Sequence, residues 1–267
     1  MSKPSGIKPL SRSSKINLLL YGDPGYGKTA LVGTTPGRSL ILRPPVDHID
    51  SIKDVPEGME EWVLPDWNEA HEAMDFLRQE GDQHYDWVWL DSISLWQDIG
   101  LDDLWETVIH EKPARARYGL DKQEYGINMF RTGKWVRHVV GARLFNFGMT
   151  AHVQMLPISL DPDAPEKLMP AIHGKVGGAL GGFAIKMCGY MNVVAYLDVT
   201  SKGTRVLYTN ATDRYYAKDQ FSSLPKGRLV SPTMPKLIKA IEESRPAASK
   251  KKPRRSGTRR RTTTKGR

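Results

Sequence analysis

The chain has 267 residues, a hydrophobic content of 39% and a formal net charge of +9. No apolar run approaches the roughly 18 residues that span a membrane, and the first residues lack the apolar stretch of a signal peptide, so we expect a cytoplasmic protein without a membrane partner. The single cysteine, Cys188, excludes an internal disulfide and an all-cysteine metal site.

The first predicted element is a buried strand over residues 16–21, and a glycine-rich loop follows it without a gap. This loop, residues 22–29, fits the phosphate-binding pattern G-x-x-x-x-G-K-[ST] at every fixed position. Its glycines let successive N–H groups point at one anion, and the helix that begins next adds its partial positive charge. Lys28 is predicted to reach the β- and γ-phosphates of ATP, and the Thr29 hydroxyl to bind Mg²⁺. The predicted nucleotide-binding residues are Gly22, Asp23, Pro24, Gly25, Tyr26, Gly27, Lys28, Thr29 and Ala30.

A second strand is predicted over residues 39–43, where two prolines stop it. Many nucleotidases of this architecture place a Glu just beyond this strand, where it orients the attacking water. This sequence has no Glu there. Asp47 is the nearest substitute and His48 a second candidate, and an ordinary turn is the alternative. A helix over residues 66–79 follows, predicted from its apolar spacing and an Asp cap.

A third strand, residues 87–91, ends in Asp91, which is predicted to lie beside Mg²⁺ across from the phosphate loop. Helices are predicted around residues 101–109 and over 123–140, and a fourth strand over 144–151. His152 follows this strand and is predicted to sense the γ-phosphate, a structural histidine being the alternative. The candidate catalytic residues are Lys28, Asp91, Asp47 and His152.

Residues 155–172 contain four prolines and little periodicity, which predicts a long functional loop. The loop leads into a glycine-rich turn and a short helix, residues 173–186. In this turn, Lys175 is placed to meet a neighbouring subunit's nucleotide or a phosphate backbone, and a hinge is the alternative. A hairpin of strands near 191–197 and 204–209 follows, and Met234, Leu237, Ile238 and Ile241 mark a last amphipathic helix.

The positive charge is concentrated at the end of the chain. Residues 249–267 carry ten Lys or Arg and no acid, so the other 248 residues have a net charge of −1. We expect a flexible lead at 1–14, a folded domain at 15–246 and a disordered basic tail at 247–267. Such a tail binds polyanions by counterion release, a solubilising role being the alternative. The candidate nucleic-acid-binding residues are Lys175, Lys250, Lys251, Lys252, Arg254, Arg255, Arg259, Arg260 and Arg261.

The alternation of strands and helices predicts an α/β fold, with a mostly parallel sheet flanked by helices, a C-terminal β-hairpin and a last helix. The phosphate loop, the strand end at 90–92, the stretch 118–135, the strand end at 150–152 and the turn at 173–175 occur in one order. This order resembles that of the phage-encoded RecA-like AAA-family ATPases of the single-strand annealing and recombination type. The resemblance covers roughly residues 15–212.

The resemblance implies a RecA-like P-loop core that binds ATP and Mg²⁺, assembles as a homo-oligomeric ring or filament on single-stranded DNA and pairs complementary strands. It also implies that residues 155–172 face the DNA, that a single-strand-binding protein is a partner, and that the protein works in the host cytoplasm. The sequence departs from RecA-like enzymes in having no Glu after the second strand. This difference bears on the rate of ATP hydrolysis more than on nucleotide binding.

The alternative function is a motor or remodelling ATPase, such as a helicase or helicase loader. Such an enzyme needs an arginine finger from a neighbouring subunit, for which Arg115, Arg117, Arg131 and Arg137 are candidates. A small-molecule kinase would need an acceptor pocket and a lid, and the sequence offers neither.

Overall fold

The computed structural model describes residues 15–157, 165–174 and 182–244. Within these ranges the main sheet has nine strands: β1 (Asn17–Tyr21), β2 (Ser39–Arg43), β3 (Met59–Val63), β4 (Trp87–Leu90), β5 (Asn146–Ala151), β8 (Val193–Val199), β9 (Arg205–Tyr208), β10 (Lys218–Asp219) and β11 (Arg228–Val230). The helices are α1 (Lys28–Val32), α2 (Trp67–Gln79), α3 (Gly81–His84), α4 (Ile93–Glu111), α5 (Lys122–Ala142), α6 (Gly182–Tyr190) and α7 (Met234–Ser244). Two short 3₁₀ helices are η1 (Pro113–Arg117) and η2 (Pro225–Gly227).

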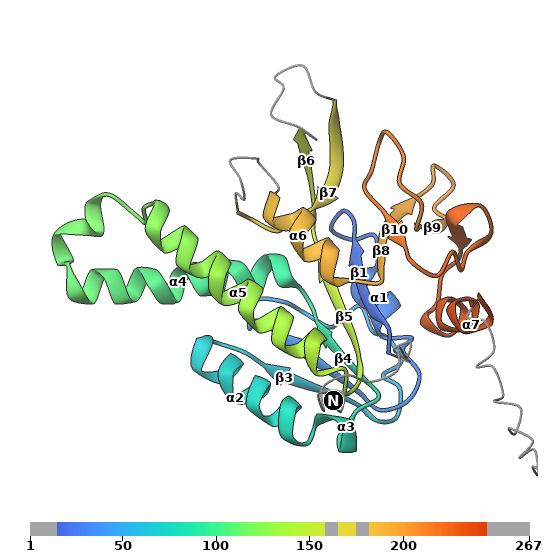
Figure 1. The fold of residues 1–267 in the computed structure, drawn as a ribbon, viewed down its shortest axis with the longest axis horizontal. Helices are drawn as coiled ribbons and strands as arrows, with labels where there is room; N and C mark the ends of the chain where they lie inside the picture. The colour runs from blue at the N-terminus through green and yellow to red at the C-terminus, as the bar shows by residue number, and fades with distance from the viewer. Residues whose placement is uncertain (1–14, 158–164, 175–181, 245–267) are drawn as a thin grey trace, which may run out of the picture.

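The strand order is β11-β9-β8-β1-β5-β4-β2-β3, with β10 paired to β8 (Figure 1). The six strands from β8 to β3 in this order are parallel, and β9, β10 and β11 add antiparallel pairs at the β8 side. Because parallel strands end at the same edge of a sheet, the residues that follow β1, β2, β4 and β5 come together there. The sheet therefore confirms the predicted α/β fold.

The two faces of the sheet bury separate cores, because successive side chains of a strand point to opposite faces. In β1, Leu19 and Tyr21 pack with residues of α2, α4, α5 and α6. Leu18 and Leu20 pack on the other face with residues of α1 and α7. Cys188 is fully buried in the first core. None of the helices that the structure describes is long and apolar enough to cross a membrane.

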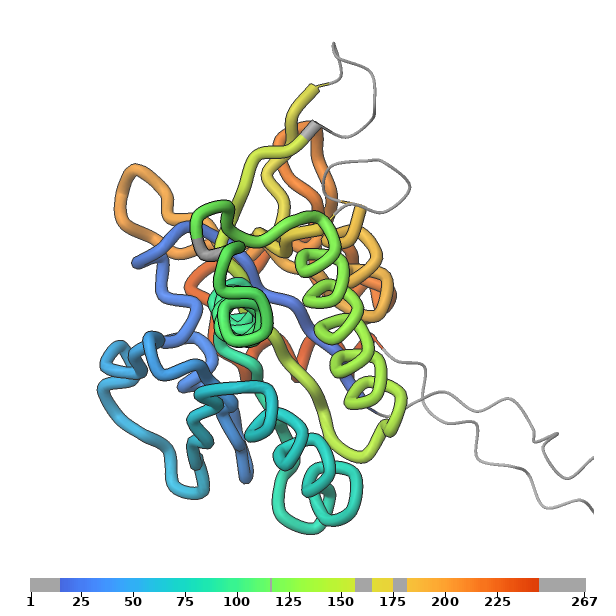
Figure 2. Tube along the Cα trace, turned by 90° about the vertical axis from the view of Figure 1, so that its left-hand side faces the viewer, coloured from blue at the N-terminus to red at the C-terminus, as the bar shows by residue number. Residues whose placement is uncertain are grey.

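Helices α4 and α5 extend beyond the sheet as a paired arm, which points toward the viewer in Figure 2. Arg131 of α5 pairs with Asp103 of α4 at 2.9 Å. At the tip, Arg115 pairs with Asp121 at 3.0 Å and with Glu124 at 2.8 Å, while Asp121 and Glu124 cap the start of α5. These contacts hold the two helices of the arm in a fixed relation.

Most predicted elements agree with the structure to within two residues. The predicted strands correspond to β1, β2, β4, β5, β8 and β9, and the predicted helices to α2, α5 and α7. Helix α4 begins at Ile93, well before the predicted start at residue 101, and α6 ends at Tyr190, beyond the predicted end at residue 186. The Asp66 carboxylate caps α2 by accepting hydrogen bonds from the N–H groups of Asn68 and Glu69. The predicted lead 1–14, Lys175 and the basic tail 247–267 lie outside the described residues.

The prediction of a long loop over residues 155–172 is wrong in the described part of that segment. Strands β6 (Val153–Pro157) and β7 (Glu166–Pro170) form an antiparallel hairpin, in which Val153 lies opposite Pro170 and Pro157 opposite Glu166. The two strands form a two-stranded sheet of their own, so both are edge strands, in which proline is tolerated, and Pro157 and Pro170 are their last residues. The prolines therefore misled the sequence-based expectation.

Candidate functional site

The predicted phosphate loop lies between β1 and α1, at the edge where the parallel strands end. Gly25 and Gly27 have φ angles of 80° and 91°, in the left-handed region that favours glycine. Gly22 needs no such freedom, but a Cβ there would collide with the carbonyl oxygen of Leu197 in β8. The loop thus requires glycine for backbone conformation at two positions and for space at the third.

Lys28 is buried at the start of α1, with only 8% of its surface exposed. Its Nζ donates hydrogen bonds to the carbonyl oxygens of Gly22 at 3.0 Å and Asp23 at 3.1 Å, which holds the ammonium group over the loop. Burial lowers the pKa of Lys28, and the nearby carboxylates of Asp91, Asp23 and Asp47 oppose this effect. The structure therefore gathers the Lys28 ammonium group and several acids around the predicted phosphate position.

Asp91 follows β4 directly and is 3% exposed. Its carboxylate accepts hydrogen bonds from the hydroxyl groups of Thr150, near the end of β5, and Thr29, in the first turn of α1. Burial raises the pKa of Asp91, and the two threonine hydrogen bonds oppose this rise. The Asp91–Ser92 peptide bond is cis. Since β5 lies between β1 and β4, Thr150 bridges the gap between the phosphate loop and Asp91.

The donor set fits Mg²⁺ bound together with a nucleotide. No group of three or more His, Cys, Asp or Glu that could hold a metal ion occurs within the described ranges. Mg²⁺ at phosphate sites needs few protein ligands, because phosphate oxygens and water supply the others. Thr29 and Asp91 offer a hydroxyl and a carboxylate that already touch each other. When bound there, Mg²⁺ would neutralise charge that develops on the phosphates.

Asp47 lies in the turn after β2 and is partly buried beside the site. It accepts hydrogen bonds from Ser92 and lies close enough to Lys28 for the two charges to interact. Burial raises the pKa of Asp47, and these hydrogen bonds oppose the rise. His48, the second candidate for orienting the attacking water, is exposed. The position of Asp47 therefore favours Asp47 over His48 for this role.

We expect Asp47→Asn to lower ATP turnover by about 100-fold while sparing ATP binding, because an amide cannot accept a proton from water. Only the ionised carboxylate can act, and burial raises the pKa of Asp47. Turnover by the unsubstituted protein should therefore fall as the pH drops, and the residual turnover of the variant should lack this dependence. Steady-state ATPase assays across pH check both points, with His48→Ala as the control. Equal turnover in Asp47→Asn would remove this residue from the reaction.

His152 follows β5 and is partly buried near the same edge. Its backbone N–H donates to the Ser94 hydroxyl at 3.0 Å. Burial and the Lys28 ammonium both lower the pKa of His152, while Asp91 and Asp98 oppose this effect. The imidazole is therefore neutral at pH 7 and can donate one hydrogen bond and accept one. This position is compatible with the predicted sensing of a γ-phosphate.

Two buried polar residues on α4 belong to the site, although no motif pointed to them. The Ser94 hydroxyl donates to the Ala171 carbonyl oxygen at 2.7 Å. The Gln97 side chain donates to the His173 carbonyl oxygen at 3.1 Å and accepts from the His173 N–H at 2.8 Å. These bonds attach the chain after β7 to the helix that follows Asp91. They carried no signal in the sequence, because both residues precede the helix predicted around residues 101–109.

The arginine finger candidates lie on the arm and at its base. Arg115 and Arg131 form the ion pairs that hold the arm together. Arg137 donates a hydrogen bond to the Tyr190 hydroxyl at 3.4 Å, and Arg117 is exposed. Three of the four guanidinium groups therefore have a structural partner within the chain.

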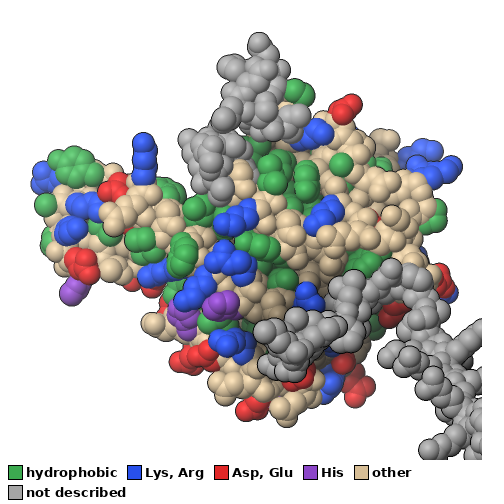
Figure 3. All heavy atoms as spheres, viewed as in Figure 1, with side chains coloured by type: hydrophobic (Ala, Val, Ile, Leu, Met, Phe, Trp, Pro, Cys, Tyr) green, Lys and Arg blue, Asp and Glu red, His purple; other side chains and the backbone are tan. Residues whose placement is uncertain are grey.

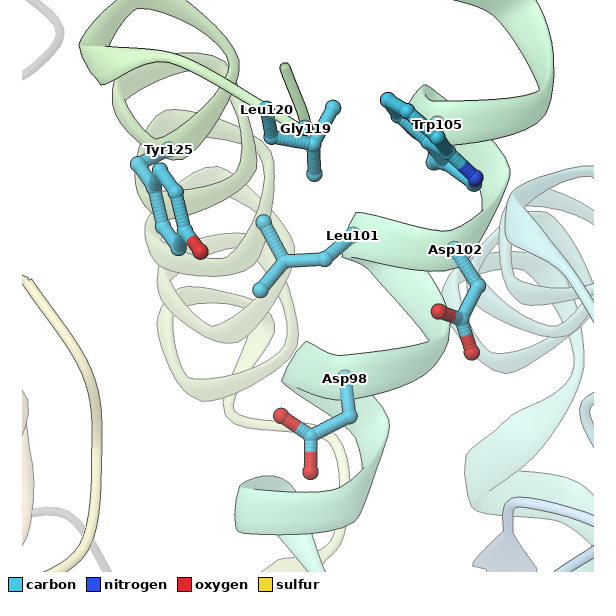
Figure 4. A pocket seen from close by; sticks show the side chains of 7 residues that line it. All are labelled: Asp98, Leu101, Asp102, Trp105, Gly119, Leu120 and Tyr125. Atoms are coloured by element: carbon cyan, nitrogen blue, oxygen red, sulfur yellow. The ribbon is translucent and has the colours of Figure 1, made fainter. Parts of the chain in front are cut away.

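A separate hollow of about 380 Å³ lies on the arm (Figure 4). Its lining comes from α4, from the segment before α5 and from the first turn of α5, and comprises Asp98, Leu101, Asp102, Trp105, Gly119, Leu120 and Tyr125. Burial raises the pKa of Asp98, and the nearby His173 opposes this rise. Large hydrophobic side chains are also exposed on the arm (Figure 3): Tyr118, Tyr125, Ile127 and Phe130. The hollow contains no phosphate-loop residue and is distinct from the nucleotide site.

The fold and the site define a P-loop nucleotide-binding ATPase: a glycine loop after β1 with a buried lysine, and a buried acid after β4 that touches the loop's threonine. Residues 14–221 match the family AAA_24, described as an AAA domain, and the chain belongs to this family. No curated protein matches the chain. The predicted AAA-type ATPase is thereby confirmed at the level of the family, and the individual residue roles stay predictions.

Proposed function

We propose that this AAA-family ATPase binds single-stranded DNA and promotes the annealing of complementary strands in homologous recombination. ATP and Mg²⁺ would bind at the phosphate loop and control assembly of a homo-oligomer, a ring or a filament, on the DNA. In a phage-infected cell the protein would act in the host cytoplasm, alongside a single-strand-binding protein. Hydrolysis would follow binding, with Asp47 in place of the usual Glu.

The β6–β7 hairpin carries this proposal. Strand β6 begins directly after His152. After β7 the chain comes back to the nucleotide site, where His173 is hydrogen-bonded to the Gln97 side chain. Tyr21, at the end of β1, donates a hydrogen bond to the Leu168 carbonyl oxygen of β7 at 3.0 Å. The hairpin projects beyond the sheet in Figure 1. A change at the γ-phosphate could thus reorient the segment that the RecA-like resemblance assigns to DNA.

An annealing assay tests the proposal. Complementary oligonucleotides are mixed with the protein in three conditions: with ATP, without nucleotide, and with a slowly hydrolysed ATP analogue. We expect faster annealing with ATP and with the analogue than without nucleotide, because nucleotide binding controls assembly. Lys28→Ala is the control. Unwinding of a duplex, or stimulated loading of a helicase, would support the motor or remodelling alternative instead.

Deleting residues 249–267 should weaken binding to single-stranded DNA and flatten its salt dependence. Each phosphate neutralised on a single strand contributes about 0.7 to the slope of log K against log salt, so ten tail cations could supply up to about seven. The slope is measured from the affinity for a labelled oligonucleotide at salt concentrations from about 50 to about 300 mM. A chain with serine at the ten basic positions separates charge from length. An unchanged slope would show that the tail does not contact DNA.

A further inference from the structure

The β8–β9 hairpin packs directly against the phosphate loop. Strand β8 runs parallel to β1, with Tyr196 opposite Tyr21, and so brings the Leu197 carbonyl oxygen against Gly22. The chain then turns and returns as β9, whose first residue, Arg205, lies opposite Val199. The hairpin therefore borders the loop at its beginning and again near its end.

Arg205 makes the second of these contacts. Its Nε donates a hydrogen bond to the Tyr26 carbonyl oxygen at 2.9 Å. Its guanidinium covers Gly27 so closely that a Cβ there would lie 2.6 Å from Nε and 2.9 Å from Nη2. The Arg205 carbonyl oxygen in turn accepts a hydrogen bond from the Ser231 N–H at 2.9 Å, which attaches this part of β9 to the chain beyond β11.

The charge of Arg205 has no acidic partner in the part of the chain that the structure describes: none of the ion pairs formed there includes this residue. The side chain is exposed, yet it is oriented by a backbone carbonyl of the loop. Arginine carries five N–H donors, and the bond to Tyr26 uses one of them. An oriented guanidinium with spare donors beside an anion-binding loop matches a nucleoside polyphosphate by charge and by hydrogen bonding.

We infer that Arg205 is a positioning residue of the nucleotide site, which holds the Tyr26–Gly27 segment in its phosphate-binding conformation and supplies a second cation at the loop in addition to Lys28. Lys28 bonds to the loop at Gly22 and Asp23 and Arg205 bonds to it at Tyr26, so two positive charges from distant parts of the sequence contact the loop. The inference rests on nucleotide binding at this loop. It does not depend on whether the protein anneals DNA.

The test compares Arg205→Ala and Arg205→Lys with the unsubstituted full chain. We expect Arg205→Ala to raise the Kd for ATP by roughly 10- to 100-fold, the range for loss of a charged hydrogen bond. The KM for ATP should rise by a similar factor while kcat changes little. Arg205→Lys should recover only part of the affinity, because an ammonium group cannot donate from the Nε position. Free guanidinium ion should partly restore binding to Arg205→Ala.

Lys202→Ala, in the exposed turn of the same hairpin, is the matched control and should bind ATP normally. Thermal unfolding of each variant separates loss of binding from loss of folding. Comparing the Kd values of ATP, ADP, AMP and adenosine tests whether Arg205 acts on the phosphates. The loss of affinity in Arg205→Ala should grow with the number of phosphates. Equal ATP affinity in a folded Arg205→Ala protein would overturn the inference. If Lys28→Ala also bound ATP normally, the nucleotide site itself would be wrong.

Discussion

Replacing Lys28 with alanine should abolish ATP binding at micromolar concentrations. The ammonium group is buried and bonded to two loop carbonyl oxygens, so it is already positioned at the loop for an incoming anion. Truncating one partner of a buried, hydrogen-bonded charge pair costs about 2–5 kcal/mol, which is roughly 30- to 5000-fold in affinity. Calorimetric titration with MgATP measures the loss. Lys28→Met is a useful companion because it keeps most of the apolar stem.

Lys236→Ala is the matched control for this substitution. Lys236 is exposed on α7, and its Nζ also donates to a backbone carbonyl oxygen, that of Ser231, at 3.0 Å. It therefore repeats the chemistry of Lys28 away from the site and should leave ATP affinity unchanged. Unchanged affinity in a folded Lys28→Ala protein would contradict the assignment of the loop as the phosphate site.

Asp91→Asn should remove Mg²⁺-dependent ATP turnover while leaving the fold in place. The amide has the shape of the carboxylate and can still accept the hydrogen bond from Thr150, but it lacks the charge that attracts the ion. We expect kcat to fall by roughly 100- to 1000-fold, equivalent to about 3–4 kcal/mol of lost transition-state stabilisation. Because burial raises the pKa of Asp91, removing the charge should not lower the free energy of unfolding of the nucleotide-free protein.

The control for Asp91→Asn lies at the other end of the same strand, β4. Asp86 precedes β4 at the opposite edge of the sheet, where it is exposed and forms an ion pair with Arg38 at 3.6 Å. Asp86→Asn should leave turnover and its dependence on Mg²⁺ unchanged. Assays at increasing Mg²⁺ concentration separate weaker metal binding, which excess Mg²⁺ would restore, from a loss of turnover that it would not. Full turnover in Asp91→Asn would exclude this carboxylate from the Mg²⁺ site.

The sequence predicts the parts of the site that are local. The phosphate loop and Asp91 each follow an apolar strand directly. A short stretch of sequence therefore contains both the end of the strand and the residues expected to bind the nucleotide. Strand β3 was missed because it lies at the edge of the sheet beside β2, and its Met-Glu-Glu-Trp-Val sequence is only partly buried. A central strand is covered on both faces and is therefore an apolar run in the sequence. An edge strand is less buried, so its sequence lacks this pattern.

The contacts between distant segments could not be predicted in this way. Arg205 meets Tyr26 across 179 positions of sequence, and Gln97 meets His173 across 76. Neither pair follows from periodicity, because both depend on the strand order, which places β8 beside β1 and β5 between β1 and β4. An alignment of strands into a sheet is a property of the whole chain, whereas a motif is a property of a few adjacent residues.

The attachment of the β6–β7 hairpin at both ends has a consequence for how this domain can diversify. His152 and His173 are anchored by Ser94 and Gln97, so the site fixes where the chain leaves the nucleotide edge and where it returns. Tyr21 and Ser94 also bond to the carbonyl oxygens of Leu168 and Ala171 between these anchors, so changes of length that leave the nucleotide edge in place are expected only toward the tip of the hairpin, beyond these contacts. Transplanting the tip of this hairpin between AAA relatives should therefore change the surface that it presents while leaving nucleotide binding at the phosphate loop unchanged.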